Sequence, residues 1–210
     1  MSRPRSTQNP VWKDGFLFLG NQPALDFLNT RPVQNGESLE LLPTFGALLR
    51  WFQAADLLSS REAATLLQRW GESVRARRVV EAVQELREHF RKELVAWERG
   101  GPVSHSTVRE LNRLMADHPM RIRLKATGRL SSTELYYEPR QPEDLFAPLA
   151  HGVATLFADV DRERVRKCAQ CVLHFLDTSK KGTRRWCSMQ LCGNRQKVAA
   201  YAARHRLRRP

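Results

Sequence analysis

The chain has 210 residues, 41% hydrophobic and 27% charged, which is typical of a globular protein with one large domain, or one domain plus a small one. No apolar run of about 18 residues is present, which excludes a membrane-spanning helix. The basic start MSRPRSTQNP lacks the apolar core of a signal peptide, so we expect a cytoplasmic protein. The formal net charge is +13, which favours a polyanionic partner, chiefly nucleic acid, over a merely solubilising tail.

The first predicted elements are short. FLFLGN (16–21) has the length and apolar character of a strand, and GNQPALDFLNT (20–30) runs from a turn into an apolar patch. Three polar residues of the second stretch, Asn21, Asp26 and Asn29, have two interpretations. They line a pocket for a small ligand or, as we favour, they cap the first helix and form buried hydrogen bonds that hold it.

Helical patterns follow. A helix is predicted after Pro43, and Ser59 with Glu62 has the capping-box spacing that begins another. The longest helix begins at Ser73, carries apolar residues at steps of three and four, and ends at glycines 100–101.

A second capping-box pair, Thr107 and Glu110, predicts the start of a further helix. The period then changes, because MRIRLKA (120–126) and LSSTELYYE (130–138) alternate as the two strands of a hairpin do. A last helix is predicted over 142–160. These elements predict an α+β fold, mostly helical with a small β-hairpin.

Charge and cysteines divide the chain into a domain at 1–161 and a smaller one at 162–210. The first part is nearly neutral, with 21 basic and 20 acidic residues, whereas the second carries 14 lysines and arginines against two acidic residues. All four cysteines lie in the second part, in the pattern C-x2-C-x15-C-x4-C: Cys168, Cys171, Cys187 and Cys192.

Two close cysteine pairs separated by a loop are typical of a zinc site in a reducing compartment. Four thiolates at about 2.3 Å from one Zn²⁺ form a closed tetrahedral shell without a place for water, which indicates a structural zinc. A redox CxxC is disfavoured because a second pair is present and no βαβ pattern surrounds it. A segment of about 43 residues buries too little surface to fold alone, so zinc should supply much of its stability.

Within this segment, CAQC (168–171) is predicted to form a metal knuckle, and 172–177 and 183–186 are predicted to pair as a hairpin. GNRQKVAAYAARHR (193–206) then has helical spacing. A knuckle, a hairpin and a helix whose start supplies the last cysteines make a treble-clef-like, four-cysteine zinc finger.

The stretch CAQC…FLDTSKKGTRRWCSMQLCGNRQKVAAY resembles the CGNR zinc finger, whose tetrapeptide stands here at 192–195. LGNQPALDFLNT resembles the ABATE domain that accompanies this finger in a family of bacterial stress-related transcription regulators. Together the two resemblances cover nearly the whole chain. They imply a zinc-dependent DNA-binding module coupled to a second domain, for which we expect ligand sensing or oligomerisation.

The candidate nucleic-acid contacts are cationic and polar residues of the finger. Arg184 and Arg185 are neighbours in a predicted strand, so one should face DNA while the other packs or neutralises the zinc–thiolate cluster. Gly193 should let backbone N–H groups approach sulfur, Asn194 should cap the following helix, and Arg195 should contact either nucleic acid or the cluster. The full candidate set is Lys180, Lys181, Arg184, Arg185, Asn194, Arg195, Lys197 and Arg204.

We therefore expect a DNA-binding transcription regulator and not an enzyme, since no Gly-rich phosphate loop, G-x-S-x-G or H-E-x-x-H motif is present. One alternative is an RNA- or ribosome-associated zinc module, although the exposed aromatic set of single-strand readers is lacking. The other is a metal-dependent nuclease, for which the segment offers only His174, His205, Asp177 and Glu163 at unsuitable spacing. One small finger specifies few bases, so we expect a homodimer. The ligand-sensing interpretation of the first domain implies a small-molecule effector as a second partner.

Overall fold

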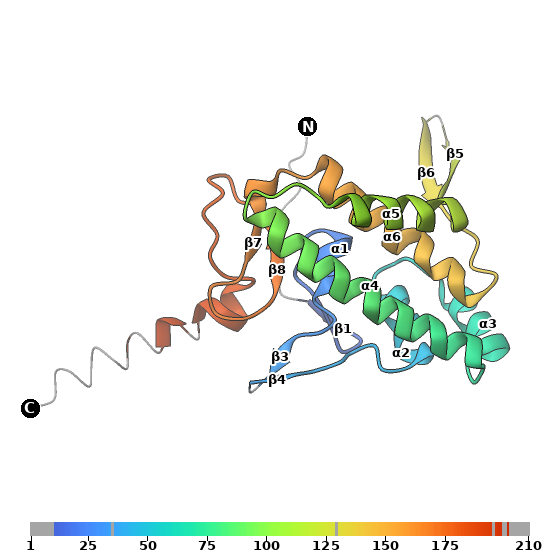
Figure 1. Ribbon diagram of the computed structural model, residues 1–210, viewed down its shortest axis with the longest axis horizontal. Coiled ribbons are helices and arrows are strands. Elements are labelled where there is room, and N and C mark those ends of the chain that lie inside the picture. Colours follow the sequence, from blue (N-terminus) through green and yellow to red (C-terminus); the bar gives the residue numbers. More distant parts are fainter. Residues whose placement is uncertain (1–10, 35, 129, 195, 199–200, 202–210) are drawn as a thin grey trace, which may run out of the picture.

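Helices build most of the molecule (Figure 1). The structure is a computed structural model that describes residues 11–34, 36–128, 130–194, 196–198 and 201. The predicted α+β class is confirmed: within the described residues, every strand belongs to an antiparallel two-stranded sheet, β1 with β2, β3 with β4, β5 with β6 and β7 with β8. The elements in chain order are β1 (Val11–Lys13), β2 (Phe16–Phe18), α1 (Pro23–Leu28), β3 (Val33–Gln34), β4 (Glu37–Ser38), α2 (Phe45–Ala54), α3 (Ser60–Trp70), α4 (Val74–Glu98), α5 (His105–Asp117), β5 (Arg121–Thr127), β6 (Leu130–Tyr136), the 3₁₀ turn η1 (Pro142–Leu145), α6 (Phe146–Asp159), the 3₁₀ turn η2 (Arg162–Arg164), β7 (Val165–Lys167), β8 (His174–Leu176) and the π-helical turn η3 (Met189–Gly193).

The first hairpin lies between two hydrophobic cores. Asp14 and Gly15 join β1 to β2 with φ of +53° and +84°, the left-handed pair that a two-residue hairpin turn requires. Side chains alternate along β2. Phe16 packs into the core formed by the helices α1 to α6, here called the helical body, whereas Leu17 and Leu19 pack into a second core around the cysteines. The strand predicted over FLFLGN is confirmed.

Capping residues define the starts of the helices α2, α3 and α4. The Ser59 hydroxyl accepts the Glu62 N–H and the Glu62 carboxylate accepts the Ser59 N–H, so the predicted capping box is present. Ser73 caps α4 by accepting the Ala76 N–H at 3.0 Å. The helix predicted after Pro43 is α2, and none of the described helices is long and apolar enough to cross a membrane.

The predicted start of α5 is wrong. Helix α5 begins at His105, three residues after Pro102, and its cap is Ser104, whose hydroxyl accepts the Thr107 N–H at 3.3 Å. Glu110 does not close a capping box, because its carboxylate lies 2.8 Å from His89 Nδ1 on the helix α4. A tertiary contact thus takes the side chain that the local pattern assigned to a cap.

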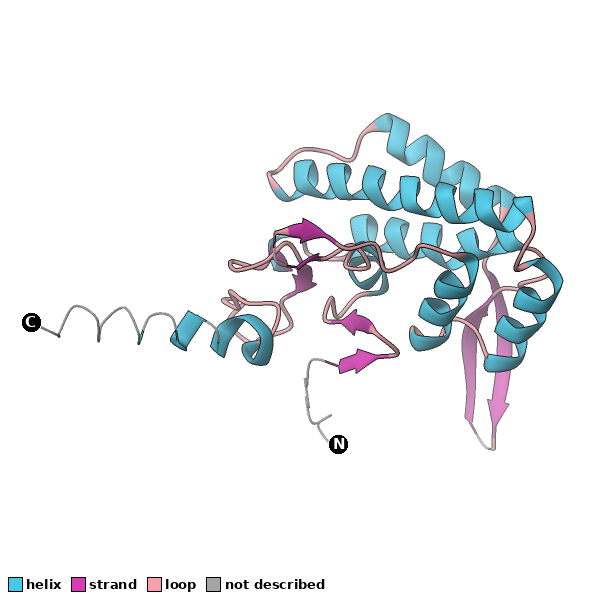
Figure 2. Ribbon diagram, turned by 90° about the horizontal axis from the view of Figure 1, so that it is seen from below, coloured by secondary structure: helices cyan, strands magenta, loops and turns pink. Residues whose placement is uncertain are grey.

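The β5–β6 hairpin and the last helix agree with the prediction. Ile122 pairs with Leu135 and Leu124 with Thr133 in an antiparallel register, and both views show the hairpin projecting from the helical body (Figures 1 and 2). The helix predicted over 142–160 appears as η1 followed by α6.

The body core surrounds the long helix α4. Its inner residues Val83, Phe90 and Leu94 are almost fully buried against α1, α2 and α6. A charged residue, Arg87, is also fully buried on this helix and donates hydrogen bonds to Thr30 and Glu40.

The finger hairpin has a different partner from the predicted one. β8 pairs with β7, Val165 opposite Leu176, so the knuckle CAQC lies in the turn between these two strands. Residues 183–186 form no strand. The charged stretch DRERVRK (161–167) spans the boundary between the two predicted domains and supplies β7, in which Val165 enters the body core while Arg166 and Lys167 remain exposed.

Candidate metal centre and nucleic-acid interface

The four cysteines meet at one point. Their Sγ atoms all lie within 4.8 Å of one another, with 3.7 Å between Cys171 and Cys187 and 3.6 Å between Cys187 and Cys192. A tetrahedral Zn²⁺ with four sulfur ligands at about 2.3 Å has sulfur–sulfur edges of about 3.8 Å. The sulfur positions therefore fit a closed structural zinc site.

The pKa values of the four clustered thiols also indicate that a cation is needed to deprotonate all of them. Hydrogen bonds from the thiols of Cys171 and Cys187 hold the pKa of Cys168 far below its ordinary value. Conversely, the contact with Cys168 raises the pKa of Cys171 to about 12, and hydrogen bonds with Cys168 and Cys171 raise the pKa of Cys187. One thiolate forms readily, but the next ones need a nearby positive charge, which Zn²⁺ supplies.

The backbone around the cysteines is ordered by local hydrogen bonds. The Cys187 N–H donates to Cys168 Sγ at 3.3 Å, and Ser188 caps η3 by accepting the Gln190 N–H at 3.1 Å. The predicted cap, Asn194, instead lies in helical conformation and is exposed. The cap precedes the turn that holds Cys192, one turn earlier than the sequence pattern indicated.

Gly193 lies close to the side chains of Met189 and Trp186 and does not approach sulfur with its N–H. A Cβ at this position would lie 2.6 Å from Met189 Sδ and 3.0 Å from Trp186 Cδ1. Its N–H donates to the Ser188 carbonyl at 3.0 Å, so the predicted N–H···S role falls to Cys187. Trp186 packs against the apolar core around the cysteines.

The two neighbouring arginines separate as expected, one inward and one outward. Arg184 lies 4.4 Å above the Phe175 ring, donates to the carbonyls of Trp186 and Cys187, and has a pKa lowered by burial. Arg185 is exposed and lies 5.0 Å from the Trp186 ring. The structure thus places Arg184 beside the metal centre and Arg185 on the surface.

The other candidate contacts that can be placed are exposed. Lys180 and Lys181 form the turn after β8, and Lys197 lies on the helical segment after η3. Arg195 and Arg204 lie outside the described residues.

Two further cations that were not predicted from the sequence, Arg166 and Lys167, belong to the same surface. Both are exposed on β7, and Arg166 donates to the Gly182 carbonyl at 3.2 Å, which holds it beside the Lys180–Lys181 turn. Arg164 supports the same turn through the Ser179 carbonyl at 2.7 Å. The sequence offered only a weak signal for this strand, the single apolar residue Val165 among the basic residues of RVRK.

The polar residues of GNQPALDFLNT form hydrogen bonds, but the favoured interpretation is only partly confirmed, because the N-cap of α1 is Gln22, whose side chain accepts the Ala24 N–H at 2.6 Å. Asp26 Oδ1 accepts the Gly20 N–H at 2.7 Å, and burial raises the pKa of Asp26 to about 7. Asn21 and Asn29 reach the finger: Asn21 Nδ2 donates to the Leu176 carbonyl at 3.1 Å, and Asn29 bonds both backbone groups of His174.

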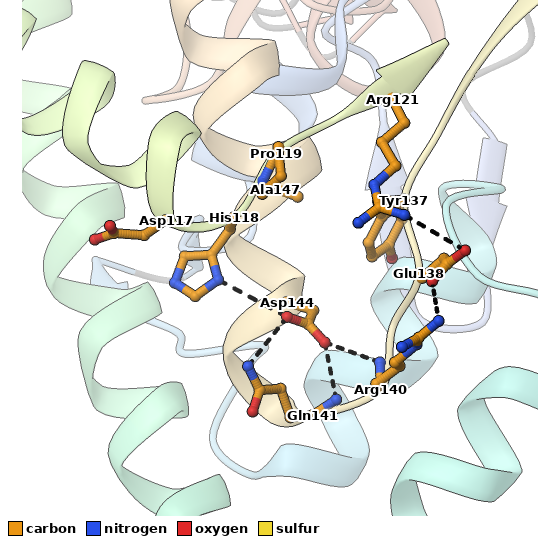
Figure 3. A pocket seen from close by; sticks show the side chains of 10 residues that line it. All are labelled: Asp117, His118, Pro119, Arg121, Tyr137, Glu138, Arg140, Gln141, Asp144 and Ala147. Carbon is orange, nitrogen blue, oxygen red and sulfur yellow. Dashed lines mark hydrogen bonds and ion pairs between the residues drawn. The ribbon is translucent and has the colours of Figure 1, made fainter. Parts of the chain in front are cut away.

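A cavity of about 370 Å³ lies at the N-terminal end of α6, beside the base of the β5–β6 hairpin (Figure 3). His118 Nδ1 lies 3.8 Å from Asp144 Oδ1, and Asp144 Oδ2 accepts the N–H groups of Arg140 and Gln141, both at 2.9 Å. Arg121 reaches in from the hairpin base. Charged groups of both signs therefore line this cavity.

Comparison with known families agrees with this arrangement. The ABATE family, described as "Putative stress-induced transcription regulator", matches residues 21–160, and the CGNR zinc finger matches residues 164–205. Neither description names an enzyme. No protein of curated function matches the chain. The four clustered cysteines and both matches lead to one conclusion: the chain belongs to the ABATE family of transcription regulators and carries a CGNR zinc finger with a structural zinc.

Proposed function

We propose that this protein is a cytoplasmic, zinc-dependent DNA-binding transcription regulator without enzymatic activity. Residues 162–210 form the DNA-binding part, with Cys168, Cys171, Cys187 and Cys192 as zinc ligands, and residues 1–161 form a domain that senses a ligand or holds two copies together. Zinc orders the finger, and the ordered finger presents its cations to the phosphates and base edges of DNA.

The observation that carries the proposal is the sign of the exposed charge on the finger. Of the two acidic residues in 162–210, Asp177 is 2% exposed and accepts the N–H groups of Ser179 and Arg184, and Glu163 is exposed before β7, so cations predominate on the exposed surface. Such a surface attracts phosphates and releases their counterions. Among the residues that the structure describes, the exposed cations from β7 to the segment after η3 are Arg166, Lys167, Lys180, Lys181, Arg185 and Lys197.

The double variant Lys180→Ala/Lys181→Ala is expected to bind duplex DNA more weakly at every sequence. Each lost phosphate contact reduces the slope of log affinity against log salt by about 0.9, so the double variant should lose about one to two. Fluorescence anisotropy of a labelled duplex over a range of salt concentrations measures both quantities.

The matched control is Arg123→Ala/Lys125→Ala, which removes two positive charges from the projecting β5–β6 hairpin. We expect its salt slope to equal that of the parent chain. If both double variants lose affinity equally, the finger turn has no special role and only net charge matters.

The alternatives are separated by the same titration. A chain that binds RNA or single-stranded DNA more tightly than the matching duplex would be the RNA module, and metal-dependent cleavage of the probe would indicate a nuclease. Asp177, the one acidic side chain between Val165 and Asn194, is buried and hydrogen-bonded, which disfavours the nuclease.

For the effector we propose the cavity beside His118 and Asp144. Because its lining carries both signs of charge, a small molecule with an anionic and a cationic group fits it best. A thermal-shift screen of such zwitterions against the parent and His118→Ala tests this site, and a ligand that stabilises both equally binds elsewhere. Sedimentation velocity tests the proposed homodimer.

A further inference from the structure

The boundary between the helical body and the zinc finger is interleaved. From the body, Leu17 and Leu19 are 6% and 5% exposed and pack with the cysteines and Phe175 in the core around the metal centre. From the finger, Val165 of β7 is 5% exposed and belongs to the body core. Each part therefore completes the hydrophobic core of the other.

Hydrogen bonds join the two parts at the start of GNQPALDFLNT. The Leu176 N–H of β8 donates to the Gly20 carbonyl at 2.7 Å, and Asn21 Nδ2 donates to the Leu176 carbonyl. Gly20 itself is tightly packed, since a Cβ there would lie 2.7 Å from Leu25 Cβ. The turn before α1 therefore holds the outgoing end of β8 in a fixed place.

The side chain of Asn29, at the end of α1, bonds the backbone of β8 as a second neighbouring strand would. Asn29 Oδ1 accepts the His174 N–H at 3.0 Å and Asn29 Nδ2 donates to the His174 carbonyl at 2.8 Å. Asn29 and His174 are 1% and 2% exposed, so water cannot replace either bond. Residue 174 follows the knuckle cysteine Cys171 by three positions, so Asn29 holds the strand that leaves the knuckle.

We propose that Asn29 is a positioning residue for the metal centre, and that through it α1 and the finger become ordered and bind zinc as one cooperative unit. This proposal requires only that the four cysteines bind a structural zinc, and it does not depend on DNA binding. By linkage, zinc must then stabilise the ordered state of α1 by the same factor by which ordered α1 strengthens zinc binding.

The first test measures zinc affinity in the full-length chain by competition with a chromogenic chelator. We expect Asn29→Ala to bind zinc at least about tenfold more weakly than the parent, because both buried backbone groups of His174 lose their partners. Asn112→Ala removes the same amide from an exposed position on α5 and should bind zinc like the parent. Equal zinc affinities of the two variants would overturn the proposal.

Two further variants separate positioning from a general loss of stability. Leu66→Ala opens a cavity in the body at a residue that is 2% exposed on α3, and its folded state should bind zinc like the parent. Asn21→Gly suits the φ of +55° at this position and removes a single bond to β8, so it should weaken zinc binding by a smaller factor than Asn29→Ala. If Leu66→Ala weakens zinc binding as much as Asn29→Ala, the effect is a general loss of stability and is not specific to the boundary between the helical body and the finger.

A measurement on the parent chain does not depend on any variant folding. Hydrogen–deuterium exchange with peptide mapping, with and without a chelator, follows α1 and α3 separately. We expect removal of zinc to speed exchange in α1, which contacts β8, while α3 at the far end of the body keeps its protection (Figure 1). If exchange in α1 is unchanged when zinc is removed, the two parts are not coupled and the proposal is wrong.

Discussion

Replacing Cys187 by serine is expected to remove zinc from the chain and to abolish DNA binding. Cys187 is fully buried, its Sγ lies within 3.7 Å of Cys171 and Cys192, and its N–H bonds Cys168 Sγ. A small segment that depends on its metal for stability loses much of its folding free energy when one of the cysteine ligands is removed. We expect less than half of the parental zinc per chain by elemental analysis and DNA affinity weaker by at least about a hundredfold.

The control is the parent chain treated with a chelator and then with zinc. Zinc should restore its DNA affinity, whereas the same addition should not rescue Cys187→Ser. A variant that keeps one zinc per chain and parental DNA affinity would show that the four cysteines do not form the metal centre.

Replacing Arg87 by methionine should cause a large loss of stability in the helical body. The Arg87 guanidinium is fully buried, donates to Thr30 Oγ1 and Glu40 Oε1, both at 2.9 Å, and to Glu88 Oε1 at 3.1 Å. Methionine fills much of the volume but leaves the two carboxylates without their central cation. We expect the free energy of unfolding to fall by about 2–4 kcal/mol in urea denaturation.

Arg113→Met is the matched control, because Arg113 forms an exposed pair with Asp117 one turn along α5. Such pairs contribute less than about 0.5 kcal/mol. Equal stabilities of the two variants would contradict the structural role of Arg87. Arg87 also donates to Thr30, the residue after Asn29. We therefore expect its loss to weaken the contact between Asn29 and the finger as well.

Features set by neighbouring residues were predictable from the sequence. The Ser59–Glu62 capping box, the β5–β6 hairpin and the clustering of the cysteines each follow from spacing or periodicity within one segment. The pairing of β7 with β8 was not, because a strand of three residues with one inward side chain, Val165, resembles a charged linker until the body core that receives it is known.

The roles of the polar residues near α1 depend on partners far along the chain. Asn29 bonds His174 and Asn21 bonds Leu176, 145 and 155 residues away. Single-sequence periodicity carries no information about such pairs, so the sequence indicated buried hydrogen bonds without naming their partner. The same holds for Glu110, which was assigned to a local cap but pairs with His89 across two helices.

The role of zinc in DNA binding is tested most directly by a DNA titration of the zinc-loaded and zinc-depleted chain at one salt concentration. We expect tight binding with zinc, loss of binding after chelation, and recovery when zinc is returned. DNA affinity that is the same with and without zinc would contradict this role, because the cations of the finger would then reach DNA without the fold that the four cysteines organise.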